Sequence, residues 1–200
     1  MAVETRQISL EELDRLPDPG YPFEIVNGEV VPVSPVQDVA AIVAGRVLAY
    51  LGHHVLANQL GECLGSDPGF VVSRSPLRLR VPDLAFVGRD RTRGGAREAY
   101  FEGAPDLVGE VVSPSDPFEA VVAKVKEWLA AGARLVWVFV PRTREVYVYT
   151  PDQPVRVLGE ADLLDGGEVV PGFRVPVADC FPPLARAEAA PEARGNADRA

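Results

Sequence analysis

Apolar and polar positions along residues 105–141 follow a pattern that predicts a strand, a loop, a helix and a second strand. The first strand is apolar and is interrupted by one carboxylate, that of Glu110. Two prolines and short polar residues then end the strand, because they favour a loop and a helix start. From 118 to 131 apolar residues recur at steps of three and four, which predicts a helix with one buried face. The apolar run at 135–140 completes a βαβ-like unit with an acid in its first strand.

The N-terminal part of the chain carries the signals of a β-hairpin and a short helix. Asn27-Gly28 lies between the apolar runs 21–26 and 29–33. This dipeptide predicts a type I′ turn, because both central positions of such a turn need positive φ. Ser9-Leu-Glu-Glu12 has the spacing of a capping box and predicts a helix that ends near Pro17.

A longer helix, two strands and a loop are predicted next. Residues 37–55 have a helical apolar face. It comprises Val39, Ile42, Val43, Val47, Leu48 and Leu51. Residues 77–80 alternate as in a half-exposed strand, and residues 81–87 resemble a buried strand that carries one acid, Asp83. Residues 89–99 hold four arginines and two glycines without apolar periodicity, which predicts an exposed, mobile loop.

The length of 200 residues suits one domain with a substantial core, and we expect that domain to comprise residues 1–185. Residues 186–200 lack an apolar face and predict a disordered tail. No apolar run approaches the roughly 20 residues of a membrane span. The N-terminus has no basic start followed by an apolar block, and two cysteines fit reduced thiols. We therefore expect a cytoplasmic protein with no membrane partner.

The formal net charge of −9 argues against a broad phosphate-binding face, since such a face normally needs clustered Lys and Arg. One segment differs from the rest of the chain. Positive charge is concentrated there at Arg89, Arg91, Arg93 and Arg97. This segment could supply a local basic patch in an otherwise acidic protein.

Asp83 and Glu110 stand alone in apolar strands, and an acid on a buried strand is costly unless it is paired. Two carboxylates that converge at one end of a sheet form a hard-oxygen site that suits Mg²⁺ or Mn²⁺. A lysine from the following helix, Lys124 or Lys126, would orient a water or neutralise charge on a phosphate. Spacing alone leaves open the alternative that the acids are solvated or capping groups and the lysines are solvated charges.

Several segments occur in an order that is more specific than any one motif. They are VPDLAFV, PDLVGEVVSPSD, a lysine-bearing helix ending in AGA, RLVWVFVP and EVYVY, with YPFEIVNGEV and SDPGF upstream. This order resembles the Uma-two family of restriction-endonuclease-like proteins, in the PD-(D/E)XK nuclease superfamily, from Leu10 to Pro183. The resemblance implies an α/β (α+β) fold with a restriction-endonuclease-like mixed central β-sheet flanked by helices and an N-terminal β-hairpin.

The resemblance further implies a metal-dependent endonuclease that hydrolyses phosphodiester bonds in DNA with Mg²⁺ or Mn²⁺. Matched residue by residue, Asp83 and Glu110 are the catalytic and metal-binding acids. Glu24 falls on the acid of the family's opening hairpin and is an outer metal ligand in this interpretation.

The same matching assigns the lysine of the site to a helix. The usual lysine position of the superfamily, two residues after the Glu, is Val112 in this chain. Lys124 matches the helix lysine of the family and is the catalytic candidate, with Lys126 as the second choice. Periodicity alone puts both lysines at the edges of the buried helix face, on opposite sides.

DNA is the partner that the resemblance implies, with local contact through the Arg89–Arg97 loop. A homodimer is one assembly that the sequence leaves open. The rival interpretation, from another functional class, is a catalytically inactive nuclease-fold relic that acts as a binding or assembly module. The net charge of −9 favours that rival, because a nuclease must hold a polyanion.

Overall fold

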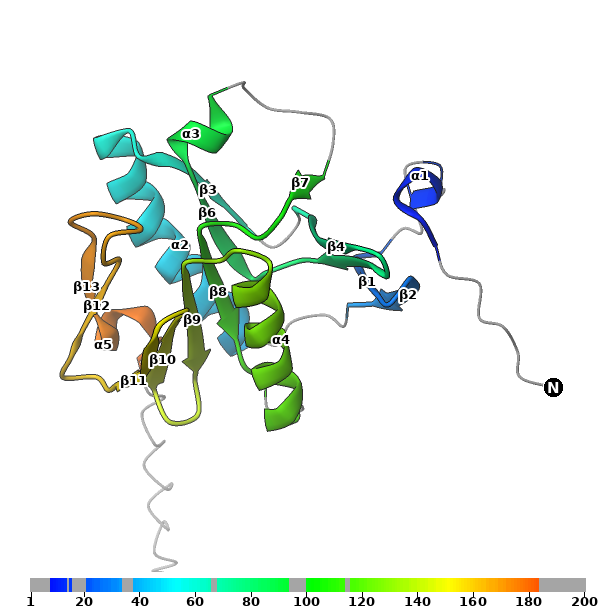
Figure 1. Ribbon diagram of the computed structural model, residues 1–200. Coiled ribbons are helices and arrows are strands. Elements are labelled where there is room, and N and C mark those ends of the chain that lie inside the picture. The colour runs from blue at the N-terminus through cyan, green and yellow to red at the C-terminus, as the bar shows by residue number, and fades with distance from the viewer. Residues whose placement is uncertain are drawn as a thin grey trace, which may run out of the picture.

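A six-stranded sheet lies at the centre of the computed structural model (Figure 1). In spatial order its strands are β11 (Gln153–Leu158), β10 (Glu145–Thr150), β9 (Leu135–Val140), β8 (Leu107–Val111), β6 (Leu84–Gly88) and β3 (Gly61–Leu64). β8 and β9 are parallel and the other neighbours are antiparallel, so the central sheet is mixed, as predicted. The structure describes residues 8–13, 15, 21–33, 38–65, 68–93, 100–113 and 116–183.

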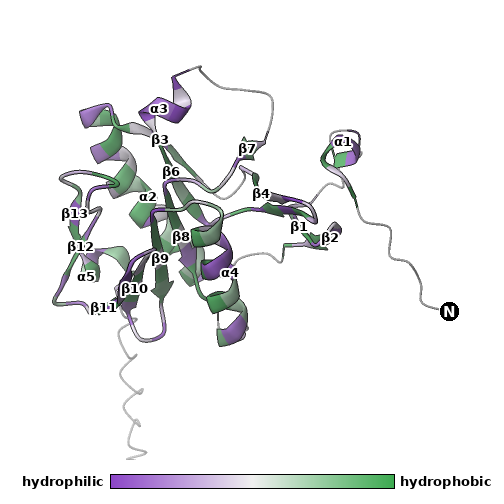
Figure 2. Ribbon diagram, in the orientation of Figure 1, coloured by the Kyte–Doolittle hydropathy of each residue, from purple (hydrophilic) through white to green (hydrophobic). Residues whose placement is uncertain are grey.

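Two helices cover the two faces of this sheet (Figure 1). α2 (Asp38–Asn58) packs on one face and α4 (Phe118–Ala130) packs on the other. Alternate residues of β8 point to opposite faces of the sheet and pack into two hydrophobic cores. Leu107 packs with α2 residues and Val108 packs with α4 residues. β8 is therefore buried along its whole length. Figure 2 shows hydrophobic strands at the centre of the molecule, between these helices.

A second sheet of five strands carries the N-terminal hairpin. Its order is β2 (Glu29–Pro32), β1 (Phe23–Val26), β5 (Leu77–Arg80), β4 (Phe70–Arg74) and β7 (Phe101–Glu102). The remaining elements are the two-stranded pair β12 (Leu163–Asp165) and β13 (Arg174–Pro176) and the short helices α1 (Leu10–Leu13), α3 (Arg89–Thr92) and α5 (Val177–Cys180). The short helix α1 ends at Leu13 rather than near Pro17.

The face that α2 buries differs in part from the predicted one. The buried residues of α2 are Ala40, Val43, Val47, Leu51 and Val55. Val39 and Ile42 are 46% and 44% exposed, because they flank this stripe instead of lying on it. In the described part of the chain, α2 is the one helix whose length and composition would suit a membrane span. Its buried stripe packs against the central sheet, as that of a core helix does.

Local signals in the sequence are confirmed where the chain is described. Asn27 and Gly28 have φ of 53° and 82°, so both central residues of the hairpin turn are in the left-handed region that the turn needs. The backbone N–H of Ser9 donates to Glu12 Oε2 at 3.0 Å, and the backbone N–H of Glu12 donates to Ser9 Oγ at 3.3 Å. The two bonds form the predicted capping box.

The arginine-rich segment is only partly the loop that the sequence predicts. Its first four residues form α3, and Thr92 Oγ1 donates to the carbonyl of Arg89 at 3.3 Å within that helical turn. Residues 94–99 lie outside the described residues, and so does the tail at 186–200. The extent of the single domain, 1–185, stays a prediction.

Candidate active site

The two predicted acids lie at the same end of the central sheet. Asp83 directly precedes β6, and Glu110 lies near the end of β8, which runs antiparallel to β6 with Leu84 opposite Gly109. Asp83 Oδ2 accepts a hydrogen bond of 2.6 Å from the backbone N–H of Val111. The carboxylate of Asp83 is therefore tied to the residue that follows Glu110.

Glu110 is almost fully buried, with 8% of its surface exposed, and both of its oxygens are paired. Oε1 accepts a hydrogen bond of 2.7 Å from the indole Nε1–H of Trp128, and Oε2 accepts one of 3.0 Å from Lys124 Nζ. The Trp128 ring is fully buried in the core, and its indole also holds the acid of the site. Such pairing offsets much of the cost of burying the carboxylate.

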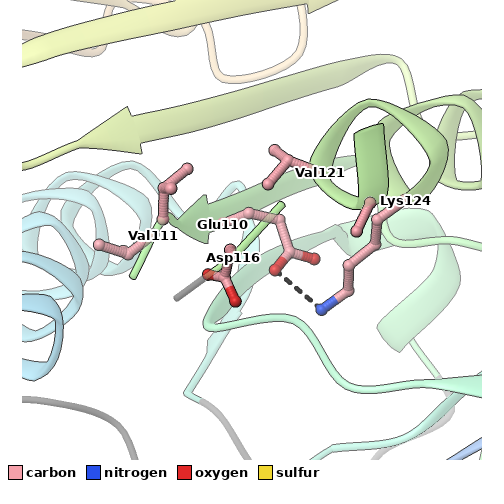
Figure 3. A pocket seen from close by; sticks show the side chains of 7 residues that line it. Glu110, Val111, Asp116, Val121 and Lys124 are labelled. Carbon is pink, nitrogen blue, oxygen red and sulfur yellow. Dashed lines mark hydrogen bonds and ion pairs between the residues drawn. The ribbon is translucent and has the colours of Figure 1, made fainter. Parts of the chain in front are cut away.

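Lys124 reaches the site from α4, one helical turn before Trp128 and on the same side of the helix (Figure 3). Its Nζ also lies 3.3 Å from Glu24 Oε1, and 27% of its side chain is exposed. Lys126 is exposed on another side of α4, as expected for two helix residues roughly 200° apart. Of the two predicted lysines, Lys124 is therefore the one that the fold brings to Glu110.

Glu24 comes from β1 of the second sheet and is buried beside the site. Its Oε2 accepts a hydrogen bond of 2.7 Å from Arg80, and its Oε1 accepts one of 3.1 Å from the backbone N–H of Val81. Both oxygens of Glu24 thus have protein donors. Its role as an outer metal ligand stays a prediction.

A cavity of about 140 Å³ opens between the end of β8 and the start of α4 (Figure 3). It is lined by Glu110, Val111, Val112, Asp116, Ala120, Val121 and Lys124. Asp116 accepts a hydrogen bond of 2.7 Å from the backbone N–H of Ser113 and also lines the cavity. The cavity therefore offers carboxylates, one ammonium group and apolar walls.

Burial and the neighbouring charged groups shift the pKa values of the side chains in the site. Burial raises the pKa of Glu110 to about 7, with a further contribution from Asp83, and the ammonium of Lys124 offsets only part of this rise. Burial likewise raises the pKa of Asp83, although the Val111 N–H opposes it. Burial would lower the pKa of Lys124, but the carboxylates of Glu110 and Glu24 outweigh it and raise that pKa. Lys124 is therefore a permanent cation, whereas Glu110 titrates near neutrality.

The acids of the site carry oxygen ligands of the kind that a divalent cation binds. Among the described residues, no group of three or more His, Cys, Asp or Glu side chains is arranged to hold a metal ion. Mg²⁺ does not need such a group, because it usually takes one or two carboxylates and keeps several waters. Asp83 and Glu110 supply that number of carboxylates, and Glu110 lines an open cavity, so the residues fit the ion.

The arginines of α3 lie away from this site. Arg89 follows β6 and Asp83 precedes it, so the strand separates them by roughly 20 Å. Arg91 donates to the carbonyls of Ala104 at 2.6 Å and Glu102 at 3.0 Å. Arg91 therefore stabilises the backbone at the end of the sheet opposite to Asp83 and Glu110.

The mixed sheet, the crossing helices and the acidic end of β6 and β8 together define a restriction-endonuclease-like fold. The chain belongs to the Uma2 family, described as "Putative restriction endonuclease", whose sequence profile matches residues 10–178. A solved structure with a similar fold is that of "a putative nuclease belonging to DUF820" from Anabaena variabilis. It has a TM-score of 0.76 and 20% sequence identity, covering 87% of this chain and 97% of that one. The search of curated proteins finds no match.

Sequence patterns did not indicate three residues that shape the site. Arg80 donates hydrogen bonds to both Glu127 and Glu24, and Trp128 donates one to Glu110. The sequence pattern around Arg80 is a weak signal. In LRLR, charged residues alternate with leucines, and such charged residues are most often solvated. Only the packing of α4 against strands that are distant in sequence brings these residues together.

Proposed function

We propose that the protein is a divalent-metal-dependent nuclease that hydrolyses phosphodiester bonds in DNA. One observation carries the proposal: Lys124 of α4 donates to Glu110 of β8 at 3.0 Å, while Asp83 is bonded to the residue after Glu110. Glu110 and Lys124 thus line one cavity, and Asp83 is bonded to Val111 in its wall, although Val112 stands where the superfamily usually has its lysine. Membership of a family described as restriction endonucleases supports the same reaction class.

Asp83 and Glu110 would hold Mg²⁺ or Mn²⁺ in this proposal, with Glu24 as an outer ligand. When bound, such an ion neutralises charge on the phosphate and makes a bound water more acidic. Lys124 stays protonated because its raised pKa lies far above neutrality, so it acts as a donor and not as a general base. Its ammonium would orient the attacking water or stabilise charge that develops on the phosphate. Glu24 is a second carboxylate beside this ammonium, 3.3 Å from Lys124 Nζ.

Contact with DNA through Arg89–Arg97 stays a prediction, and its geometry is restricted. A cavity of about 280 Å³ near α3 is lined by three arginines and three acids, so the charges in its lining balance. The arginines are Arg89, Arg91 and Arg134, and the acids are Asp90, Asp106 and Glu168. Phosphate contacts made by Arg89 would lie at the opposite end of β6 from Asp83, away from the bond that is cleaved. The homodimer and the cytoplasmic location also stay predictions.

The proposal is tested by incubating the purified chain with supercoiled plasmid and with single- and double-stranded oligonucleotides in Mg²⁺ or Mn²⁺. We expect cleavage that EDTA abolishes and that Asp83→Asn and Glu110→Gln each reduce by about 100-fold or more. Cleavage that persists at the same rate in both variants would refute the assignment of the site.

The second candidate function is the inactive nuclease-fold module, which the net charge of −9 favours. In that case the chain would not cleave any of these substrates in either metal. Mobility-shift assays would then decide whether it binds DNA, and binding unaltered by EDTA would support a metal-free binding module.

A further inference from the structure

Arg80 occupies a bridging position beside the proposed site. It lies at the end of β5, where its guanidinium donates to Glu24 Oε2 at 2.7 Å and to Glu127 Oε2 at 2.6 Å. The three side chains are 14%, 12% and 18% exposed, so the bridge is largely removed from solvent. Neither carboxylate was predicted to pair with this arginine.

Buried pairs of this kind fix geometry, because each charge loses its water shell and depends on its partner. Glu24 is held at Oε2 by Arg80 and at Oε1 by the Val81 N–H, so its carboxylate cannot turn away from Lys124. Burial by itself would raise the pKa of Glu24, but the charges of Lys124 and Arg80 outweigh it and lower that pKa. Glu24 therefore remains an ionised, oriented acceptor.

The same guanidinium also holds the helix that carries the lysine. Glu127 is three residues after Lys124 on α4, and the bond from Arg80 to Glu127 links that turn of the helix to β5. Three residues after Arg80 the chain reaches Asp83. One side chain thus links β1, α4 and the segment that leads to Asp83.

We propose that Arg80 is a positioning residue of the site: by holding Glu24 and Glu127 it sets where the Lys124 ammonium lies relative to Glu110. It does not touch the reacting groups itself. The effect on cleavage rests on the proposed nuclease function, whereas the effect on the position of the ammonium does not.

Arg78 provides a matched control on the same strand. It donates to Glu127 and to Asn27 Oδ1, the latter at 2.9 Å, but the structure shows no bond between it and Glu24. Arg80→Met and Arg78→Met each remove one guanidinium from the Glu127 pairing. Only Arg80→Met removes the hold on Glu24.

The chain contains its own reporter of the position of Glu110. Of its two tryptophans, Trp128 donates to Glu110 Oε1, whereas Trp137 Nε1 has no hydrogen-bond partner in the described part. Their indole N–H signals in a ¹H–¹⁵N correlation spectrum, assigned with Trp128→Phe and recorded in EDTA, report separately on the site and on the core. Lys124→Met gives the direction in which the Trp128 signal moves when the ammonium leaves Glu110.

We expect Arg80→Met to move the Trp128 signal in the same direction as Lys124→Met, with the Trp137 signal unchanged, and Arg78→Met to move neither. A Trp128 signal that stays in place in Arg80→Met overturns the proposal, and an equal shift in Arg78→Met overturns the assignment to Arg80. If Arg80→Met loses the folded spectrum, Arg80→Lys decides, because the single nitrogen of a lysine lacks the fork of donors with which the guanidinium holds Glu24 and Glu127. A smaller shift in the same direction supports the proposal, and an unmoved signal overturns it.

A second measurement uses cleavage. Arg80→Met should lower kcat by about 10- to 100-fold with little change in KM, because a misplaced catalytic group affects the transition state more than binding. In a Glu24→Gln background the same change should have a much smaller effect on kcat, since Arg80 acts largely through Glu24. Full additivity would overturn the proposal. If the chain cleaves no DNA, the nuclease function fails and the indole shifts still decide the role of Arg80.

Discussion

Lys124 donates a hydrogen bond of 3.0 Å to Glu110, although the two residues are 14 positions apart and a proline-containing loop lies between them. The parallel pairing of β8 and β9 explains the meeting, because the connecting helix α4 must cross back over the sheet. Trp128, one turn further along α4, donates to the other oxygen of Glu110. Two side chains from one face of the helix thus hold one carboxylate of the strand.

The first prediction concerns the choice between the two lysines of α4. Lys124→Met retains an apolar stem and removes the charge beside Glu110, so we expect the cleavage rate to fall by about 100-fold or more. Lys126→Met, on the exposed side of the helix, should leave the rate within about twofold. Rates are compared on plasmid DNA with thermal unfolding as a control for folding. The reverse ranking would assign the role to Lys126.

The second prediction concerns divalent cations. Isothermal calorimetry with Mn²⁺ should detect a site in the wild-type chain that Asp83→Asn and Glu110→Gln each weaken by about tenfold or more, because each removes a hard oxygen ligand. Glu24→Gln should weaken it less, since Glu24 is only an outer ligand in the proposed site. Equal Mn²⁺ affinity in all four proteins would contradict the metal site.

The third prediction is a dependence of stability on pH. Burial raises the pKa of Glu110 from 4.5 to about 7, so the folded state binds this proton more tightly than the unfolded state does. The resulting stabilisation is complete at pH values below 4.5 and is lost as the pH rises through 7. Between about pH 4 and about pH 8 the wild type should lose on the order of 3 kcal/mol more than Glu110→Gln.

Urea unfolding in EDTA at several pH values measures this difference in the free energy of unfolding. Asp106→Asn serves as the control, because it changes an acid at the other end of β8. Parallel stability curves for the wild type and Glu110→Gln would show that Glu110 ionises as it does in water.

The fourth prediction tests the arginine-rich segment. Replacing Arg89, Arg93 and Arg97 with Ala should weaken DNA binding and reduce its dependence on salt concentration. The reason is that binding releases fewer counterions when fewer phosphate contacts form. Arg91 is retained because it donates to two backbone carbonyls, and its loss would disturb the fold. Fluorescence anisotropy over a salt series measures both quantities. An unchanged affinity and slope would exclude this segment as the contact.

The parts of the fold that the sequence predicts are those whose signals are local. The hairpin at Asn27-Gly28 and the unit of β8, α4 and β9 follow from turn chemistry and from apolar periodicity, which act over a few residues. The buried stripe of α2 was predicted less well, because the sheet that selects it is formed by strands far away in the sequence.

The candidate site divides in the same way. Asp83 and Glu110 were noticeable because an acid in an apolar strand is costly, whereas the choice of Lys124 needed the family resemblance. Arg80 gave no such signal, since an arginine alternating with leucines in LRLR looks solvated. Its partners come from β1 and α4, and no short stretch of sequence contains all three.

Val112 and Lys124 line the same cavity, one directly after β8 and one on α4. A positive charge placed at either backbone position would face Glu110, so the two positions are alternative locations for one function. A chain with lysine at both positions would remain active after the loss of either one. The lysine could therefore move from one position to the other during evolution without an inactive intermediate. Accordingly, Val112→Lys should restore part of the cleavage that Lys124→Met removes. The site would then depend on the position of the lysine charge relative to Glu110, and residues at different sequence positions could supply that charge.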